Sequence, residues 1–390
     1  MKSRIFTCMI ATISFAVTAA LIAAPAPTNY TVVELGMLGG TASGASSINN
    51  RSWVAGFSNL LGDTTAHATL WRNGSTLDLG TLGGPGTNSA VIWPVKNDRG
   101  LLAGIAETSD INPLGETWSC AAFFPTVTGH VCLGFVWQNG VMTALPTLGG
   151  YDGYAAGANN RGQVVGWAEN TTHDSTCVAP QVLQFRAVLW GPKDGQIQEL
   201  SPVPGDPTSA ATAINDWGQA VGISGVCDRA VGRFSAAHAV LWQDGIPTDI
   251  GNLGGVAWNT PTAINNRGQV VGFSDLPGDQ SGAPNFHAFL WTKSGGIQDL
   301  GTLPGDSLSL AFGINDLGQV VGQSIGAGGS RAFLWQNGVM TDLNTLVPPG
   351  SLDLVYANDI NASGEIAGGA FDPGTGESPA FLASPVKPGR

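Results

Sequence analysis

Aromatic side chains gather in two kinds of segment that are expected to form loops. The segment Ile105–Leu133 is the longest insertion in the chain and carries Trp118, Phe123 and Phe124. Three more aromatic residues follow short glycine-rich connections, namely Tyr151, Tyr154 and Trp258. Exposed aromatic rings can stack on sugar rings or hold a peptide. These six are our candidate binding residues; the alternative is that they cover the small cores of their own loops.

Catalytic patterns in the sequence are weak. The one Gly-x-Ser-x-Gly match, Gly322–Gly326, belongs to the repeated strand segment, and there is no His-Glu-x-x-His and no phosphate-binding loop. His67, His238 and His287 share a position in an internal repeat, but other copies lack histidine there, so they form no metal set. We therefore predict no catalytic residue, no metal site and no cofactor.

Four cysteines remain after the first 24 residues, and an even number in an exported chain suggests two disulfides. Three pairings are possible. We favour Cys120 with Cys132, because both lie in one insertion. Cys177 and Cys227 occupy the same gap of two successive repeats, which neighbouring units would bring together. Free thiols are the alternative.

Seven copies of one motif form the framework that must position these residues. The best copies contain DLGTLGG, then IN-x-x-GQVVG, then a variable gap and HAFLW. The asparagine of the central turn marks each copy, at Asn49, Asn97, Asn159, Asn215, Asn265, Asn315 and Asn361. Their spacing of 46 to 62 residues is typical of a propeller blade.

Each copy contains four short strand signals separated by Asn- and Gly-rich turns. A four-stranded sheet cannot bury both faces alone, so the sheets must stack, and seven in a ring leave only protected edges. We predict an all-β, seven-bladed β-propeller of four-stranded antiparallel blades. A tryptophan recurs at one position in six copies, which suggests packing between blades. The variable gaps are expected on one face, which we take as the binding face.

The chain ends predict how the ring closes. Tyr30–Gly36 matches the DLG strand of the motif, whereas Ala380–Leu382 matches AFLW, so the last blade lacks the strand that the N-terminal segment supplies. Pairing the two segments would close the ring. We assign 1–24 to a secretory signal, 25–29 to a linker, 30–383 to the propeller and 384–390 to a tail.

The leader and the charge constrain location and partners. Lys2 and Arg4 precede an uncharged stretch that ends before Pro25, the layout of a cleaved secretory signal; an uncleaved anchor is the alternative. The net charge of −12 argues against nucleic acid or an anionic membrane as partner. We expect an exported monomer, extracellular, cell-surface or periplasmic, with no membrane insertion after signal cleavage.

The repeat motifs resemble those of a known family. His287–Trp291 (HAFLW), Asp299–Leu303 (DLGTL) and Gly268–Gly272 (GQVVG) are similar to the HAF family of extracellular repeat proteins. The resemblance covers nearly all of Tyr30–Leu382, and the second copy departs most. It implies export and repeat architecture, and it supplies no catalytic residues. A looser similarity to WD-repeat propellers concerns topology only.

Two functions remain open at this stage. The first is a secreted, non-enzymatic binding module for a glycan, a cell-wall polymer or a protein. The second is a propeller hydrolase or lyase that acts on an extracellular polysaccharide or peptide. An enzyme should gather acidic or basic side chains from several repeats at one mouth of the channel. The repeats look uniform there, so we expect binding rather than catalysis.

Overall fold

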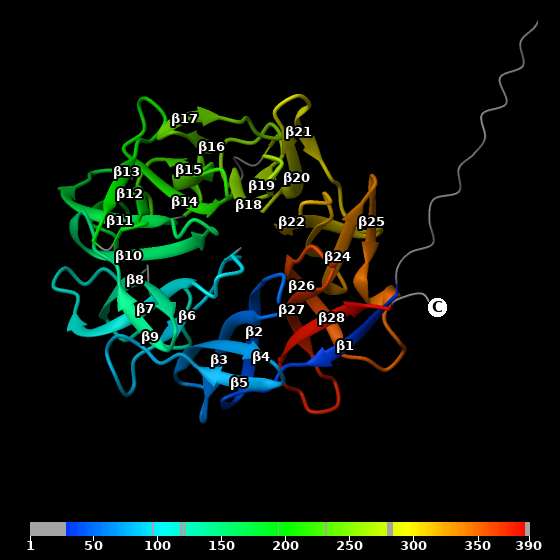
Figure 1. The fold of residues 1–390 in the computed structure, drawn as a ribbon. Coiled ribbons are helices and arrows are strands. Elements are labelled where there is room, and N and C mark those ends of the chain that lie inside the picture. The colour runs from blue at the N-terminus through cyan, green and yellow to red at the C-terminus, as the bar shows by residue number, and fades with distance from the viewer. Residues whose placement is uncertain are drawn as a thin grey trace, which may run out of the picture.

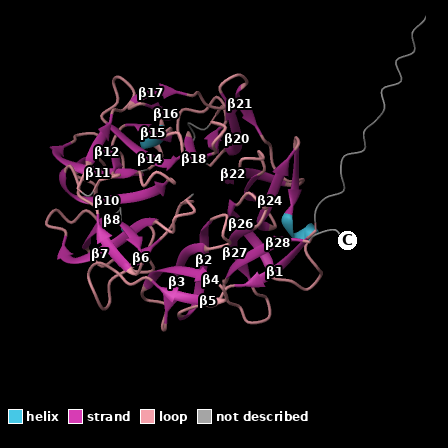
Figure 2. Cartoon of the chain, viewed as in Figure 1, coloured by secondary structure: helices cyan, strands magenta, loops and turns pink. Residues whose placement is uncertain are grey.

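The computed structural model describes residues 29–386, apart from positions 96, 118–119, 121, 194, 231 and 279–283. The described chain forms seven separate four-stranded antiparallel sheets, arranged as blades around a central axis (Figure 1). Strands make up almost all of the regular structure, with short 3-10 helices such as Phe234–Ala236 and Leu343–Leu346 between them (Figure 2). The predicted seven-bladed propeller is confirmed.

Each blade contains four consecutive strands, ordered from the axis outwards, and only blade 7 takes its outer strand from the N-terminal segment. The strands are β2 (Gly39–Ile48), β3 (Val54–Leu60), β4 (Ala66–Arg72) and β5 (Ser75–Asp78) in blade 1; β6 (Ser89–Ala90), β7 (Leu102–Ile111), β8 (His130–Gln138) and β9 (Val141–Ala144) in blade 2; β10 (Gly149–Ala158), β11 (Val164–His173), β12 (Leu183–Trp190) and β13 (Ile197–Leu200) in blade 3; β14 (Thr208–Ile214), β15 (Ala220–Gly225), β16 (His238–Gln243) and β17 (Ile246–Asp249) in blade 4; β18 (Thr260–Ile264), β19 (Val270–Asp275), β20 (Phe286–Thr292) and β21 (Gly296–Asp299) in blade 5; β22 (Asp306–Ile314), β23 (Val320–Gly326), β24 (Gly329–Gln336) and β25 (Val339–Asp342) in blade 6; and β26 (Asp353–Ile360), β27 (Ile366–Phe371), β28 (Ala380–Pro385) and β1 (Tyr30–Glu34) in blade 7.

The ring closes by pairing of the two chain ends. β1 runs antiparallel to β28, with Tyr30 opposite Pro385 and Val32 opposite Ala383. Figure 1 shows the blue first strand beside the red last strand at the outer edge of blade 7. β28 continues to Pro385, two residues beyond the predicted end of the propeller. Residues 1–28, which include the predicted signal, lie outside the described chain.

The recurring tryptophan packs between blades, as its repetition predicts. Trp71, Trp190 and Trp242 are at most 4 % exposed. Each donates its ring N–H to a carbonyl just after the outer strand of the preceding blade, over distances of 2.6, 2.9 and 2.7 Å. The acceptors are the carbonyls of Gly36, Pro146 and Ser201. Burial of these three rings thus leaves none of their N–H donors unpaired.

The recurring asparagines form a hydrogen-bonded collar on the face of the ring where the Asn turns lie. Each holds its own turn: Asn315 Oδ1, for example, accepts from the N–H groups of Leu317 and Gln319. In six of the seven blades the side-chain Nδ2 also donates to the carbonyl of the matching asparagine in the next blade, at 2.9–3.3 Å. Blade 2 is the exception, because Asn97 donates to Leu101 in its own turn.

The residue after each collar asparagine adds a second ring of contacts. Asparagine and aspartate alternate from blade to blade, at Asn50, Asp98, Asn160, Asp216, Asn266 and Asp316. Each of the first five donates its backbone N–H to the side chain of the next residue in the series. An alternation of two residue types cannot close on an odd-numbered ring. Ala362 occupies the seventh place, and it donates its N–H to Asn50.

Both predicted disulfides are present. Cys120 is bonded to Cys132 within the insertion of blade 2, and Cys177 is bonded to Cys227 between blades 3 and 4. Disulfides persist in oxidising compartments, so the pair indicates an exported environment.

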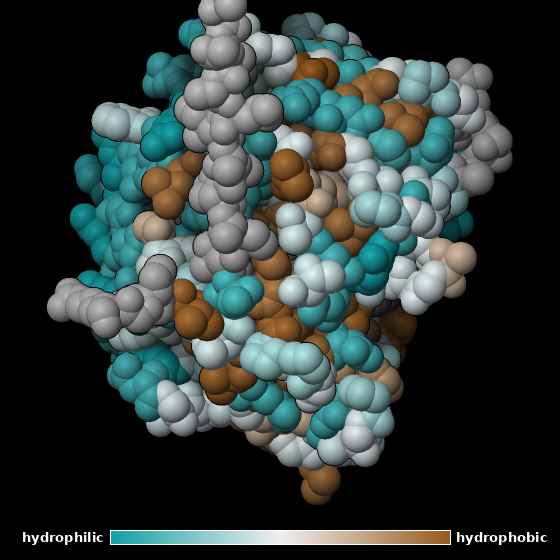
Figure 3. Space-filling model, turned by 90° about the vertical axis from the view of Figure 1, so that its right-hand side faces the viewer, coloured by the Kyte–Doolittle hydropathy of each residue, from teal (hydrophilic) through white to brown (hydrophobic). Residues whose placement is uncertain are grey.

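The outer surface is mixed in character. Figure 3 shows hydrophobic residues interspersed with hydrophilic ones on the flank that carries β25. Within the described residues, we find no helix with both the length and the apolar character needed to cross a bilayer.

Candidate functional site

An aromatic cavity of about 180 Å³ lies against the inner strands of the ring. Blades 2 to 5 contribute to its walls, and small residues such as Ala210 and Thr260 complete it. Six aromatic side chains line it, namely Trp93, Phe123, Tyr154, Trp167, Trp258 and Phe273. We call it the channel cavity. Such a concave, largely apolar site with few polar groups is typical of small-ligand binding.

The structure brings three of the six candidate binding residues together in this cavity. Phe123, from the insertion, stacks on Tyr154 with 5.4 Å between ring centroids, and Trp258 lines the same space. Phe124 is instead 8 % exposed and packs in the core beneath its own loop, which was the alternative for these residues. Tyr151 is 41 % exposed and does not line the cavity. Trp118 lies outside the described residues.

Sequence reasoning missed Trp167 and Phe273, which occupy the same position in the second strand of their blades. This position follows a Val-Gly or Ala-Gly step in every copy and otherwise holds Phe57, Ile105, Ile223, Gln323 and Gly369. Its side chains reach the interior of the ring, and most of the large ones line a cavity. The signal that could have found them is the variation between copies at a position flanked by uniform residues.

Trp93, also missed, comes from a local departure from the repeat. The inner strand of blade 2 is only Ser89–Ala90, and the chain then leaves the sheet through Ile92, Trp93 and Pro94. Trp93 therefore stands between the channel cavity and a second cavity of about 290 Å³, which blades 1, 2, 6 and 7 form. Together the two cavities follow the inside of the ring through all seven blades.

Trp258 is held in an unfavourable backbone conformation. Its φ is +52°, a region that costs a bulky side chain on the order of 1–3 kcal/mol. Three hydrogen bonds hold the segment there: the Trp258 N–H donates to Arg233 O, and Asn259 donates from its backbone and side chain to Ala236 and Ala237. Strain of this kind is found where function requires a side chain in a fixed place.

Buried acids from three blades lie next to this aromatic layer. In the second strand of each blade, the position two residues after that of Trp167 and Phe273 can be compared between copies. It holds Glu107, Glu169 and Asp275 in blades 2, 3 and 5. Because residues two apart share a strand face, Glu169 follows Trp167 and Asp275 follows Phe273 on the side of the cavity. All three acids are fully buried. The repeats therefore differ at this position, although none of the three acids lines the channel cavity.

Glu169 belongs to an acidic cluster with Asp152 and Glu116. One carboxylate oxygen of each lies within 4.8 Å of the others, and all three side chains are fully buried. The pKa of Asp152 is raised to about 8, mainly by burial and also by the charge of Glu116, whereas hydrogen bonds from Cys132 and Asn112 oppose the rise. Burial, with the charges of Asp152 and Glu116, holds the pKa of Glu169 well above its ordinary value. Without a bound cation, Asp152 and Glu169 therefore favour bound protons near neutral pH.

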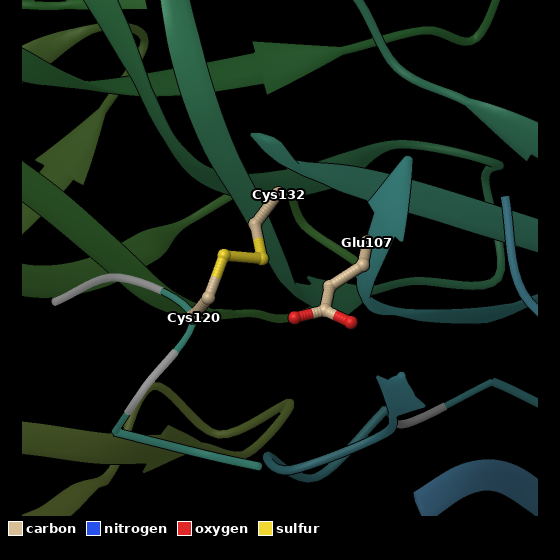
Figure 4. Close-up of side chains that lie close together, drawn as sticks. All are labelled: Glu107, Cys120 and Cys132. Carbon is tan, nitrogen blue, oxygen red and sulfur yellow. A yellow bond between two sulfur atoms is a disulfide. The ribbon is translucent and has the colours of Figure 1, made fainter. Parts of the chain in front are cut away.

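Glu107 lies apart from the acidic cluster and beside a disulfide. Figure 4 shows its carboxylate near the bond between Cys120 and Cys132. Disulfide sulfurs are not the thiolates that metal ions require, so these three residues make no metal site. Glu107 is instead held by Asn88, whose backbone and side-chain N–H groups donate at 2.7 and 2.9 Å.

The recurring histidines form structural pairs. His67, His238 and His287 each contact an aspartate on the neighbouring outer strand at 2.7–2.9 Å, namely Asp78, Asp249 and Asp299. In blade 6 Arg331 takes the same place and pairs with Asp342. The repetition of one contact around the ring marks it as part of the blade rather than of a site.

Similarity to known proteins is found among solved structures. No family model matches the chain, and no curated protein matches it either. The resemblance to HAF repeats therefore stays a prediction. Among solved structures, the chain is similar to Pyrococcus horikoshii acylaminoacyl peptidase (10% identity, TM-score 0.48, 90% of this chain and 53% of that one). Porphyromonas gingivalis dipeptidyl peptidase 4 (11%, 0.33, 85% and 44%) and Trypanosoma rangeli sialidase (8%, 0.40, 90% and 55%) are also similar.

These structural neighbours are hydrolases, and the chain spans about half of their length. They contradict our expectation of a non-enzymatic binding module, which also assumed that no acids gather near the channel. We therefore withdraw that expectation, and its alternative, an enzyme, remains a proposal. At about 10% identity the likeness concerns the fold alone, so the neighbours' substrates are not transferred to this chain.

Proposed function

We propose that the protein is a hydrolase of an extracellular polysaccharide and that the channel cavity holds one sugar unit of the substrate. The observation that carries this proposal is the convergence of six aromatic rings from three blades on one cavity. Aromatic faces carry partial negative charge and attract the C–H groups of a sugar ring, whereas its hydroxyl groups need only a few polar partners. The strained backbone of Trp258 supports the proposal, because strain is kept where function requires a side chain in one place.

The proposed acid–base group is Asp275. It follows the cavity residue Phe273 on the same strand face and lies 3.9 Å from the Arg233 guanidinium. Glycoside hydrolysis requires a carboxyl group that transfers a proton to or from the glycosidic oxygen or water. Asp275 is buried in the present conformation, so substrate binding must bring it into contact with the sugar.

Location and assembly complete the proposal. We place the active protein outside the cytoplasm, after cleavage of the leader, as a monomer. The two disulfides support the oxidising environment.

The first test is turnover. The purified protein is incubated with a panel of polysaccharides, and new reducing ends are counted. We expect release from at least one polymer, with kcat/KM reduced about tenfold or more in Phe273→Ala and about 10²-fold or more in Asp275→Asn. The control is Phe371→Ala, because Phe371 occupies the blade 7 counterpart of Asp275 and is 40 % exposed. Unchanged turnover in Asp275→Asn would remove that residue from the mechanism, and no turnover of any polymer would reject the proposal.

Trp258→Gly separates a functional role from a structural one. Glycine accepts a positive φ without strain, so the variant should melt no lower than the wild type. If Trp258 forms a wall of the substrate site, KM for the polysaccharide should nevertheless rise about tenfold or more. A lower melting temperature with an unchanged KM would identify Trp258 as a packing residue only.

A further inference from the structure

The acidic cluster joins three separate segments of the chain. Glu116 comes from the insertion of blade 2, Asp152 from β10 and Glu169 from β11. Their carboxylates converge within 4.8 Å although each is fully buried. Within the part of the chain that the structure describes, no lysine or arginine forms an ion pair with any of the three. Three like groups enclosed in this way need protons or a positive ion to be stable.

The groups around the cluster donate hydrogen bonds and hold the carboxylates as acceptors. Asp152 accepts from Cys132 N at 2.9 Å and from Asn112 Nδ2 at 3.0 Å. Glu169 accepts from Asp152 N at 2.9 Å and from Gln181 Nε2 at 2.7 Å. N–H donors favour the ionised form of a carboxyl group and offer no acceptor for a carboxyl proton.

Only one carboxylate oxygen of Glu116 accepts hydrogen bonds from N–H groups. Its Oε1 accepts from Val182 N at 2.9 Å and from Leu183 N at 2.6 Å. Its Oε2 is buried and has no hydrogen-bond partner. The buried Oε1 of Gln181 also lacks a partner, although the amide nitrogen of the same side chain contacts Glu116 and Glu169. Two oxygens in this small volume therefore have unused lone pairs.

We propose that Glu116, Asp152 and Glu169 bind one calcium ion. The N–H donors would occupy one lone pair on the carboxylates and leave others for the ion, and Glu116 Oε2 would gain the partner that it lacks. A half-turn of the Gln181 amide would add a fourth side-chain oxygen, since the two ends of an amide are nearly identical in shape.

The chemistry of the ligands selects the metal. Zinc prefers sulfur and nitrogen ligands, whereas every group offered here is an oxygen. Magnesium retains several waters of its shell and seldom uses an all-protein cage, whereas calcium accepts several carboxylate and amide oxygens in flexible geometry.

The site would connect the insertion to blade 3. Asp152 already accepts from the N–H of Cys132, and the insertion positions Phe123 over Tyr154 in the channel cavity. A bound ion would therefore stabilise one wall of the cavity. The inference does not depend on the proposed activity, because it concerns the binding of an ion to the folded protein.

The test uses the mature full-length chain after treatment with EDTA and dialysis. Terbium is a luminescent probe for calcium sites. It is titrated while the tryptophan indole rings are excited and the terbium emission is recorded, and calcium is then added as competitor. We expect one terbium per chain, displaced by calcium, and a melting temperature that rises by a few degrees with saturating calcium. Glu116→Gln should weaken terbium binding about tenfold or more, because ligand charge determines affinity in such sites.

Glu107→Gln is the matched control. Glu107 is equally buried and occupies in blade 2 the position that Glu169 occupies in blade 3, but it lies outside the acidic cluster. The Glu107→Gln variant should be less stable than the wild type. Its affinity for terbium and the rise of its melting temperature with calcium should equal those of the wild type. If Glu116→Gln fails to fold, the wild-type melting shift and terbium stoichiometry still decide. No calcium-dependent shift, or equal weakening in both variants, would overturn the calcium site.

Discussion

The two sides of the ring follow different rules. On the Asn-turn side, all seven blades present asparagine, and six of them make the same contact to the next blade. Toward the loops, equivalent positions hold residues as different as Trp167, Gln323 and Gly369. A contact that connects each blade to the next must be made repeatedly around the ring, so its residue type repeats. A side chain that faces the central space has no such partner and can vary.

Uniformity therefore marks the residues that hold this propeller together, whereas variation between copies marks the candidate site. The acids near the cavity show why this distinction matters. Glu107, Glu169 and Asp275 occupy a position where the other blades have Asn59, Gly225, Ile325 and Phe371.

The largest expected contrast is between one tryptophan from each side of this comparison. Trp242→Ala should lower the free energy of unfolding by about 3–5 kcal/mol, because Trp242 is 1 % exposed between blades and its N–H bond to Ser201 is lost. Trp258→Gly should cost nothing measurable in denaturant unfolding. Equal losses in the two variants would show that position in the repeat does not separate structure from function.

The next contrast is within the collar. Asn265→Ala removes the two turn bonds to Arg267 and Gln269 and the bond to Asn315 in the next blade, so we expect a loss of about 2–3 kcal/mol in urea unfolding. Asn97→Ala should cost about 1 kcal/mol less, because Asn97 donates within its own turn. If the Asn97 variant is the less stable of the two, the contact between blades contributes little.

The two disulfides should differ in a similar way. Cys177–Cys227 closes a separation of 50 residues and Cys120–Cys132 one of 12. Loop-closure entropy predicts losses of about 4 and about 3 kcal/mol when each pair is replaced by serine. Thermal unfolding of the two double variants measures the difference, and a reversed order would indicate that contacts in the insertion outweigh chain entropy.

The smallest effect on stability is expected at the outer strands, where a histidine–aspartate pair recurs in three blades. Burial raises the pKa of Asp299, but hydrogen bonds from His287 and Gly301 and the charge of His287 lower it more, so the net shift is downward. A lowered acid pKa stabilises the fold above the unfolded value near 3.9, and this is lost as the pH falls through the folded pKa. The contribution is below about 1 kcal/mol, since the pair is partly exposed. Asp299→Asn should flatten the acid limb of a pH–stability curve, and an unchanged limb would contradict the assignment.

Much of the fold could be predicted because the same turn and strand signals recur in every copy of the repeat. The turn chemistry of Asn315 and Gly318, four strand signals per copy and the half-repeat at each end determine four-stranded blades, and hence a ring closed by β1 and β28. The same reasoning paired Cys177 with Cys227 from their matching gaps.

The site was predicted only in part because its members meet through the ring and not along the chain. Trp93, Trp167 and Phe273 belong to three blades, and nothing in their spacing indicates that they share one cavity. Phe123 and Phe124 are neighbours in sequence, yet the fold turns one onto Tyr154 and the other into the core beneath the loop.

The sequence by itself determined the number of blades, the turns, the closure of the ring and the disulfides, because each depends on local chemistry repeated at a regular interval. Only the tertiary structure decided which aromatic rings surround the cavity and that Glu116 meets Asp152 and Glu169. These contacts depend on how far each insertion reaches across the ring, and loop geometry is not encoded in the repeat that the blades share.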